Sequence, residues 1–302
     1  MRKLITLISC FTFLLGFSQT EELESLTIQL AFQDPDTTKV NTSIRIIEIL
    51  YNDGGYDRAL KFIRESEKLS NELNYKQGVA EITYFKGLIF AKKDDYINAI
   101  DNYNKSKELY TTLSDTLSVA RINNSIALIE IERGNYDKGL QLSLSAMYEL
   151  EKRGLKNELR DSYKNLATAY NEIGESNQAI EFFEKTLNLE DELGNTAGVI
   201  ETNKSLGDLY ANQNDYQRAI YYYENVISSI DESDTILRGN VLTKLGFAYL
   251  QLNNLEDAKE YLTQGLRVNR RLSNNEGILV ALNATGDLYL RERKSIIAER
   301  LL

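Results

Sequence analysis

One pattern returns about every 40 residues through nearly the whole chain. A small residue recurs in steps of 40 or 39 positions, at Ala59, Ala99, Gly139, Ala179, Ala219, Ala258 and Ala298. Twelve positions earlier stands a second small residue, at Gly87, Ala127, Ala167, Gly207, Gly246 and Gly286, usually with an aromatic residue three positions after it. Self-similarity at a fixed period is the signature of a repeat architecture, in which each unit packs on the next.

Each repeat predicts two amphipathic helices. Apolar residues recur at helical spacing, for instance Ile220, Tyr223 and Ile227, and the small residues allow two helices to approach closely. Between them stand residue types that tolerate the left-handed conformation: Gly54, Asp94, Gly134, Gly174, Asn214 and Asn253. The predicted first helices are 37–52, 76–93, 116–133, 156–173, 196–213, 235–252 and 275–292, and the second helices are 56–73, 96–113, 136–153, 176–193, 216–232 and 255–272, with a stump at 295–302.

The order Leu206, Gly207, Tyr210, Ala219, Tyr223 resembles the tetratricopeptide repeat (TPR) family, which has Leu-Gly, Tyr three positions on and Ala twelve after the glycine. The resemblance covers residues 37–302 and implies an all-α fold, a right-handed α-solenoid of antiparallel helix pairs, with about six and a half repeats. The period of 40 instead of about 34 and the lack of a terminal proline depart from the family. Other helical solenoids with periods near 40 are the structural alternative.

The N-terminal residues differ from the repeats. Arg2 and Lys3 precede an apolar run at 4–17, which is shorter than the roughly 20 residues of a membrane span. A basic start, a short apolar run and small residues at its end predict a signal peptide, 1–18, cleaved after Ser18. We therefore expect export to the periplasm and no membrane span in the mature chain. The alternative is an inner-membrane anchor, formed by residues 4–17 or by a missing C-terminal segment.

Both ends of the repeat array carry further expectations. Residues 19–36 predict a short N-terminal helix that caps the first repeat and ends at the sole proline, Pro35. At the other end the last repeat is truncated, and the apolar Leu301 and Leu302 stand where a terminal repeat would present a polar face. This favours a fragment of a longer protein over a gene that has lost its tail.

Composition argues against most catalytic chemistry. The chain has no histidine, and its sole cysteine, Cys10, lies in the predicted signal peptide. The commonest general base, nucleophile and zinc ligands are therefore missing, and no glycine-rich phosphate loop occurs. We expect no enzyme activity, no cofactor and no metal. An enzyme built on carboxylates such as Asp208 and Asp287 is a weak alternative.

The charge excludes two classes of partner. Removal of residues 1–18 leaves 33 basic against 45 acidic residues, a formal net charge of −12. Such a chain repels phosphate backbones and anionic lipid, so we expect neither nucleic acid nor a membrane surface as its partner.

The family resemblance also implies a groove lined by the first helices. Family members contact ligands from positions three before and one, four or five after the small residue. On this basis, together with neighbouring basic residues, the predicted partner-binding residues are Tyr84, Arg121, Asn124, Lys164, Lys204, Asp208, Lys244, Phe247, Asn283 and Asp287. Amide and ammonium donors along a groove suit an extended peptide, and the lysines would form a basic strip. The alternative is that these are ordinary solvated helix positions.

Two functions remain from the sequence. The first is an exported scaffold that binds a protein or peptide in its groove. The second is the N-terminal sensory or regulatory input module of a longer bacterial signalling protein, a sensor histidine kinase or a transcriptional regulator. The family's chaperone-binding carboxylate clamp is disfavoured, because Thr168, Ser205 and Asn240 stand at clamp positions. Self-association is a further hypothesis, because Tyr221, Tyr222 and Tyr223 lie about 100° apart on a helix and cannot all face the core.

Overall fold

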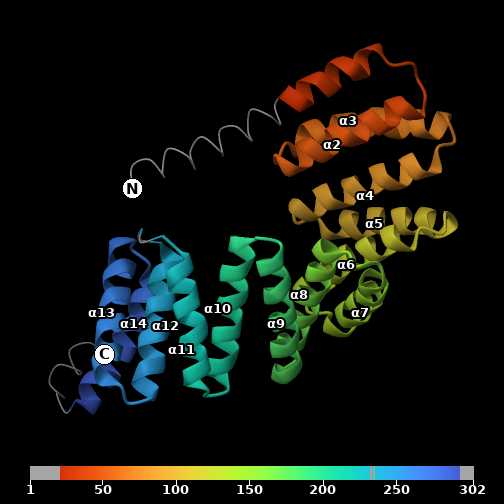
Figure 1. Cartoon of the computed structure of the whole chain (residues 1–302). Coiled ribbons are helices and arrows are strands. Elements are labelled where there is room, and N and C mark those ends of the chain that lie inside the picture. Colours follow the sequence, from red (N-terminus) through yellow and green to blue (C-terminus); the bar gives the residue numbers. More distant parts are fainter. Residues whose placement is uncertain (1–20, 232, 234, 293–302) are drawn as a thin grey trace. The chain divides into compact units, whose positions relative to one another are not determined.

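The computed structural model describes residues 21–231, 233 and 235–292, and these residues form helices and turns without a strand (Figure 1). The first helices of the repeats are α2 (Thr37–Asn52), α4 (Lys76–Lys92), α6 (Thr116–Glu132), α8 (Lys156–Glu172), α10 (Thr196–Asn212), α12 (Ile236–Gln251) and α14 (Asn275–Arg291). The second helices are α3 (Tyr56–Glu72), α5 (Tyr96–Thr112), α7 (Tyr136–Arg153), α9 (Ser176–Glu192), α11 (Tyr216–Ser229) and α13 (Leu255–Arg271). The prediction of an all-α solenoid of antiparallel helix pairs is confirmed.

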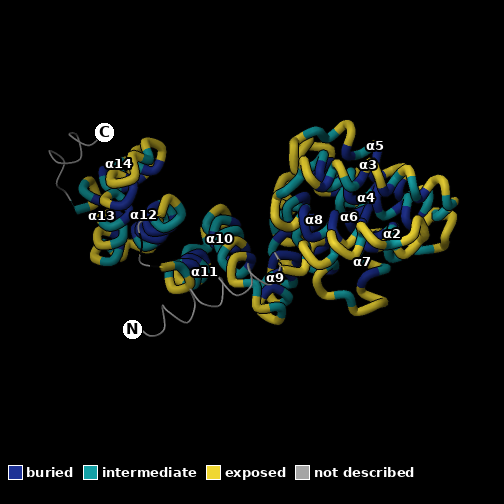
Figure 2. Tube along the Cα trace, turned by 90° about the horizontal axis from the view of Figure 1, so that it is seen from above, coloured by how far each residue is buried: buried dark blue, intermediate teal, exposed yellow. Residues whose placement is uncertain are grey.

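The chain divides into two compact units, residues 1–153 and 154–302. In the first, α2 to α7 pack in succession, and α2, α4 and α6 also touch one another in order. In the second, α8 to α14 pack in succession, and α12 also touches α14. Within each unit, buried residues lie on the helix sides that face a neighbouring helix, and exposed residues lie on the outer sides (Figure 2). The predicted continuity of a single array over 37–302 remains a prediction.

Close approach at the small residues explains the helix pairing. Gly87 on α4 faces the buried ring of Tyr103 on α5, and a Cβ added to Gly87 would lie 2.6 Å from that ring. Gly207 on α10 and Tyr223 on α11 repeat this arrangement, again at 2.6 Å. A side chain at either glycine would displace an aromatic ring from the core, which explains why the position carries only glycine or alanine from the second repeat on.

The turns follow the predicted chemistry. Every residue predicted to be left-handed between paired helices has a positive φ, from 57° at Asp94 to 83° at Gly174. Residues in most of the loops between repeats do likewise, from 52° at Asn74 to 67° at Gly194. The exception follows α11, which ends at Ser229 instead of the predicted 232, because Ile230 is extended (φ −103°, ψ 148°). This is the repeat with the 39-residue step.

A further helix spans residues 21–32 and covers the first repeat. Its Leu23, Leu26 and Leu30 pack against the core cluster that α2, α3 and α4 share. Asp36 then begins α2, because its carboxylate accepts hydrogen bonds from the backbone N–H groups of Thr38 at 2.9 Å and Lys39 at 3.1 Å. The predicted signal peptide and the stump at 295–302 lie outside the described residues.

Candidate binding groove

A hollow of about 630 Å³ opens on the side of the second unit formed by the first helices. Three successive first helices contribute, and they do so largely from the positions that the family uses for ligands. The lining residues are Asp208, Ala211 and Asn212 from α10, Tyr223 from α11, Thr243, Lys244 and Phe247 from α12, and Val280, Asn283, Ala284 and Asp287 from α14. A volume of this size admits several residues of an extended chain or a small ligand.

Asp208 is the most heavily bonded group of this hollow. Its carboxylate accepts hydrogen bonds from the Lys244 ammonium at 2.7 and 2.8 Å and from the Lys204 ammonium at 2.9 Å. The Tyr223 hydroxyl donates a fourth, at 2.7 Å. Burial raises the pKa of Asp208, but the bonds from Lys244, Lys204 and Tyr223 outweigh it and hold the pKa below its usual range. An ionised carboxylate surrounded by donors is a structural anion and a poor proton acceptor.

The second acid of the hollow is also paired. Asp287 lies 3.1 Å from the Arg291 guanidinium one turn later on α14. Arg291 in turn donates to the backbone carbonyl of Leu250 at 2.7 Å, which joins α14 to α12. Asp208 therefore joins α10 to α12, and Asp287 pairs with the arginine that joins α14 to α12.

Four of the other lining residues are exposed and available to a ligand. Phe247 and Val280 are 41% and 51% exposed, although both are apolar. The amides of Asn212 and Asn283 are exposed and make no hydrogen bond within the described part of the chain. An apolar surface between unsatisfied amides can bury a side chain while it pairs the backbone of an extended peptide.

The structure brings together half of the predicted partner-binding residues, namely Asp208, Lys244, Phe247, Asn283 and Asp287. Lys204 joins them through Asp208. Lys164 does not line the hollow and pairs instead with Glu201 on α10 at 2.7 Å. The expected basic strip is thus neutralised by carboxylates of α10, because Glu201 pairs with Lys164 and Asp208 pairs with both Lys204 and Lys244.

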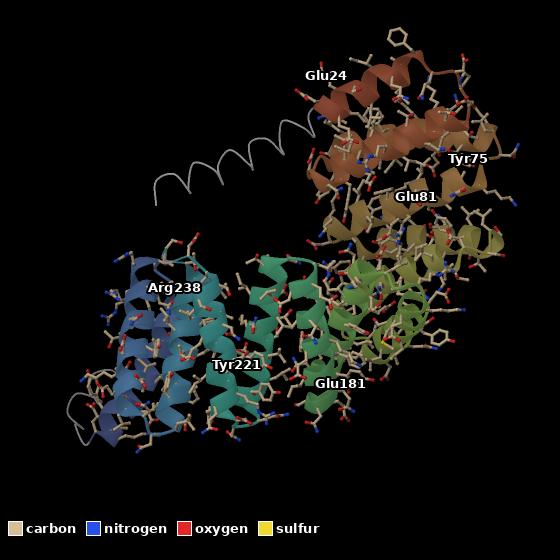
Figure 3. The ribbon with its side chains drawn as sticks, in the orientation of Figure 1. Glu24, Tyr75, Glu81, Glu181, Tyr221 and Arg238 are labelled. Carbon is tan, nitrogen blue, oxygen red and sulfur yellow. The ribbon has the colours of Figure 1, made fainter. Side chains whose placement is uncertain are left out.

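The other predicted residues lie in the first unit. The Tyr84 ring lies 5.8 Å from that of Tyr103, centre to centre, and its hydroxyl is 3.4 Å from the Ser125 Oγ. Arg121 and Tyr84 line a small recess beside Tyr110, whose hydroxyl donates to Glu81, a side chain labelled on α4 in Figure 3. Asn124 is only 7% exposed, so it lies in the helix interface and not on an open surface.

Some lining residues were not predicted. Ala211 and Asn212 stand four and five positions after Gly207, where family members contact ligands, so the pattern could have identified them. Val280 occupies none of those positions, and only its exposure in the folded chain identifies it. Tyr223 reads as a core residue from its spacing, yet its hydroxyl reaches the hollow through Asp208.

The tyrosine cluster on α11 behaves as predicted. Tyr221, labelled in Figure 3, is 60% exposed, whereas Tyr223 is 2% exposed. The ring of Tyr222 stacks on that of Tyr210 at 5.4 Å. The prediction of at least one exposed ring is confirmed, and self-association through it remains a prediction.

Two searches of the described residues bear on other functions. None of their helices is both long and apolar enough to cross a membrane. They also contain no group of three or more Cys, Asp or Glu side chains arranged to hold a metal ion.

Paired helices in succession, with a groove on the side of the first helices, define an α-helical repeat scaffold. Two family models, each described as tetratricopeptide repeat, match the chain. One matches residues 118–192 and 162–232, and the other matches residues 239–271. The chain is a tetratricopeptide repeat protein. This scaffold is typical of protein–protein interaction, and proteins built on it are generally non-enzymatic.

Solved structures share the fold at low sequence identity. The apo form of the quorum sensor NprR from B. thuringiensis has a TM-score of 0.65 at 12% identity, over 95% of this chain and 92% of that one. PilW, a widely conserved type IV pilus biogenesis factor, has a TM-score of 0.60 at 14% identity, over 80% of this chain and 98% of that one. PilF of Pseudomonas aeruginosa has a TM-score of 0.59 at 18% identity, over 76% of this chain and 91% of that one. No curated protein matches the chain in sequence.

Proposed function

We propose that this chain is an exported, non-enzymatic scaffold that binds an extended segment of a protein partner in the hollow of α10, α12 and α14. The observation that carries the proposal is the combination of exposed Phe247 and Val280 with the unsatisfied amides of Asn212 and Asn283. Export rests on the sequence of residues 1–18. The periplasm is the proposed location.

The chemistry of the hollow indicates how a peptide would bind. A peptide backbone carries one donor and one acceptor per residue, and each asparagine amide offers both. Phe247 and Val280 provide the apolar surface for one side chain between them. Asp208, Lys204 and Lys244 satisfy one another and hold α10 against α12, so they shape the hollow more than they contact the ligand.

The test begins with peptides selected from a random library displayed against the mature chain. A selected peptide is labelled and its dissociation constant measured by fluorescence anisotropy. We expect Phe247→Ser and Asn283→Ala each to weaken binding about tenfold, the size of one lost apolar contact or hydrogen bond. The control is Tyr221→Ser, which removes an exposed ring outside the hollow. Equal binding by all variants would contradict the proposal.

A second candidate is a sensory input module of a longer signalling protein. The observation that favours it is the fold shared with a quorum sensor along 95% of this chain. The two candidates differ in the gene sequence downstream of codon 302. An apolar run of about 20 residues and then a catalytic or DNA-binding domain would establish the module, and an in-frame stop codon would exclude it.

A further inference from the structure

The first unit contains a second hollow, of about 290 Å³, which we call the tyrosine pocket. It is lined by Tyr51, Leu88, Ala91, Lys92, Asp94, Tyr96, Tyr103, Ser125, Leu128, Ile129 and Glu132. Its residues on α2, α4 and α6 include the positions one, four and five after the small residue, as in the second unit. The volume lies at the lower limit for ligand sites, so it suits one side chain of a partner.

Aromatic rings wall this pocket and are fixed by their own packing. Tyr103 is 1% exposed. Tyr51 packs against Tyr56 with ring centres 5.9 Å apart and against Phe85 at 6.2 Å. Tyr96 completes the set from the start of α5. Clustered rings with negative faces are the feature by which proteins recognise cationic groups.

Two carboxylates from successive repeats meet beside these rings. The Tyr96 hydroxyl lies 3.4 Å from Asp94, in the turn before α5. Glu132, at the end of α6, lines the same pocket and interacts electrostatically with Tyr96. The interaction with Glu132, and after it the charge of Asp94, raises the pKa of Tyr96. Neither Asp94 nor Glu132 forms an ion pair within 4.0 Å in the parts of the chain described. A cation placed between two such carboxylates would be attracted by both, and it would offset their mutual repulsion.

One cation borders the pocket. Lys92 is exposed and makes no ion pair within the described ranges. The lining therefore carries two negative charges against one positive charge, in a chain that is acidic overall. An anionic group would meet net repulsion here, and a neutral one would leave the carboxylates unpaired.

We propose that the tyrosine pocket binds the cationic side chain of an arginine or lysine on a protein partner. The proposal extends the proposed groove function and rests on it for the partner being a protein. The two hollows then read different chemistry: the second unit takes an apolar side chain and backbone amides, and the first takes a positive charge. A partner segment rich in basic residues fits the acidic chain as well.

The probe that tests this is Nα-acetyl-arginine methylamide, compared with the citrulline analogue, which has nearly the same shape but no charge. The mature chain carries ¹³C-labelled tyrosine rings, and both compounds are titrated at low salt. We expect saturable shifts at Tyr51 and Tyr96, assigned by single Tyr→Phe variants, with at least fivefold weaker binding of citrulline. The lysine analogue should behave like arginine.

Variants separate a site from a general charge effect. Glu132→Gln and Asp94→Asn should each weaken arginine binding at least threefold, and asparagine tolerates the left-handed backbone of Asp94 (φ 57°). Lys92→Gln should strengthen it about threefold, because a competing cation is removed. Asp101→Asn removes an exposed charge on α5 outside the pocket and should change nothing. Circular dichroism confirms that each variant is folded.

Three results would overturn the inference: citrulline binding as tightly as arginine, an equal loss in Asp101→Asn, or shifts confined to tyrosines outside the pocket. These results leave the proposed function intact if the selected peptide still depends on Phe247 and Asn283. Conversely, peptide binding that ignores those residues while arginine still needs Glu132 would contradict the proposed function alone.

Discussion

The ammonium of Lys244 on α12 lies 2.7 and 2.8 Å from the two carboxylate oxygens of Asp208 on α10. The two residues are 36 positions apart and belong to successive repeats. Lys204 and Tyr223 bind the same carboxylate, so one anion joins α10, α11 and α12. In a solenoid each repeat is stabilised by its neighbours, and such a bridge couples their folding.

Removal of this anion should destabilise the second unit. Asp208→Asn keeps the shape but leaves two ammonium groups close together without their counter-charge. We expect a loss of about 1–3 kcal/mol in the free energy of unfolding, the usual penalty for unpairing a largely buried polar group. Urea denaturation followed by circular dichroism measures it. Part of the loss should disappear in about 1 M NaCl, where the Debye length is about 3 Å and ammonium repulsion is screened.

The matched control is Glu181→Gln on α9, labelled in Figure 3. Glu181 pairs with Lys185 at 2.7 Å, but its side chain is 61% exposed. An exposed pair of this kind contributes only about 0–1 kcal/mol. If Glu181→Gln destabilised the chain as much as Asp208→Asn, the burial and the bridging of Asp208 would not explain its effect.

The glycine opposite Tyr223 yields a second prediction. Gly207→Ala gains about 1 kcal/mol of helix propensity, but its Cβ would lie 2.6 Å from a ring that Asp208 holds in place. Overpacking of a core costs about 1–3 kcal/mol, so we expect a net loss of stability. The repeat before it has Ala167 and Phe183 at the equivalent positions, both buried.

A double-mutant cycle tests the reason. Phenylalanine at 223 loses the bond to Asp208, so its ring is no longer held by the hydroxyl and can shift away from the added methyl group. Gly207→Ala combined with Tyr223→Phe should therefore cost less than the sum of the single changes, by about 0.5–3 kcal/mol. Additive losses would show that the tether through the hydroxyl does not restrict the ring.

The left-handed turn residues predict opposite changes in stability when glycine is introduced at one such position and removed from another. Ser273 has φ 54°, and Gly174 has φ 83° with no atom within 4 Å of an added Cβ. A residue other than glycine pays about 1–2 kcal/mol for this conformation. Ser273→Gly should raise the unfolding free energy by up to about 1 kcal/mol, and Gly174→Ala should lower it by about 1–2 kcal/mol. Thermal denaturation of both variants measures the effects, and a destabilised Ser273→Gly would contradict this account.

Helix bounds were predictable because their signals are local. The columns of small residues and the left-handed Gly54, Asp94 and Asn214 mark the turn in every repeat, so the helices begin and end within a few residues of the prediction. The early end of α11 was not predicted because Ile230, whose backbone is extended, gives no turn signal in the sequence.

The site was predictable only in part, because its chemistry depends on contacts between repeats. The spacing of Lys204 and Asp208 is that of a helical ion pair, so this contact is visible in the sequence. The contact of Lys244 with the same carboxylate cannot be read from the sequence, since it depends on how α12 packs beside α10. The meeting of Asp94 and Glu132 at Tyr96 escaped for the same reason.

Glu130 on α6 occupies a position that is aromatic in every other repeat from the second on, and it yields a prediction on pH. The side chain is 3% exposed and accepts bonds from Lys138 at 2.6 Å and Asn135 at 2.7 Å. Burial raises the pKa of Glu130, but Lys138 and Asn135 outweigh it and the pKa is lowered. A carboxyl with a lower pKa in the folded chain stabilises the fold above its unfolded pKa of about 4.3. That contribution disappears as the pH falls through the folded pKa.

Glu130→Gln should therefore lower the unfolding free energy by about 1–3 kcal/mol at pH 7, with a smaller difference from the unmodified chain below about pH 4. Urea denaturation from pH 7 to pH 3 measures both curves. The control is Glu67→Gln, whose carboxylate is 3.4 Å from Lys86 and 33% exposed, so that its loss costs less. The opposite outcome is a difference in unfolding free energy between Glu130→Gln and the unmodified chain that stays constant with pH. That result would show that the loss comes from the packing of the amide and not from the lost charge. In that case the charge of Glu130 would contribute nothing to the first unit.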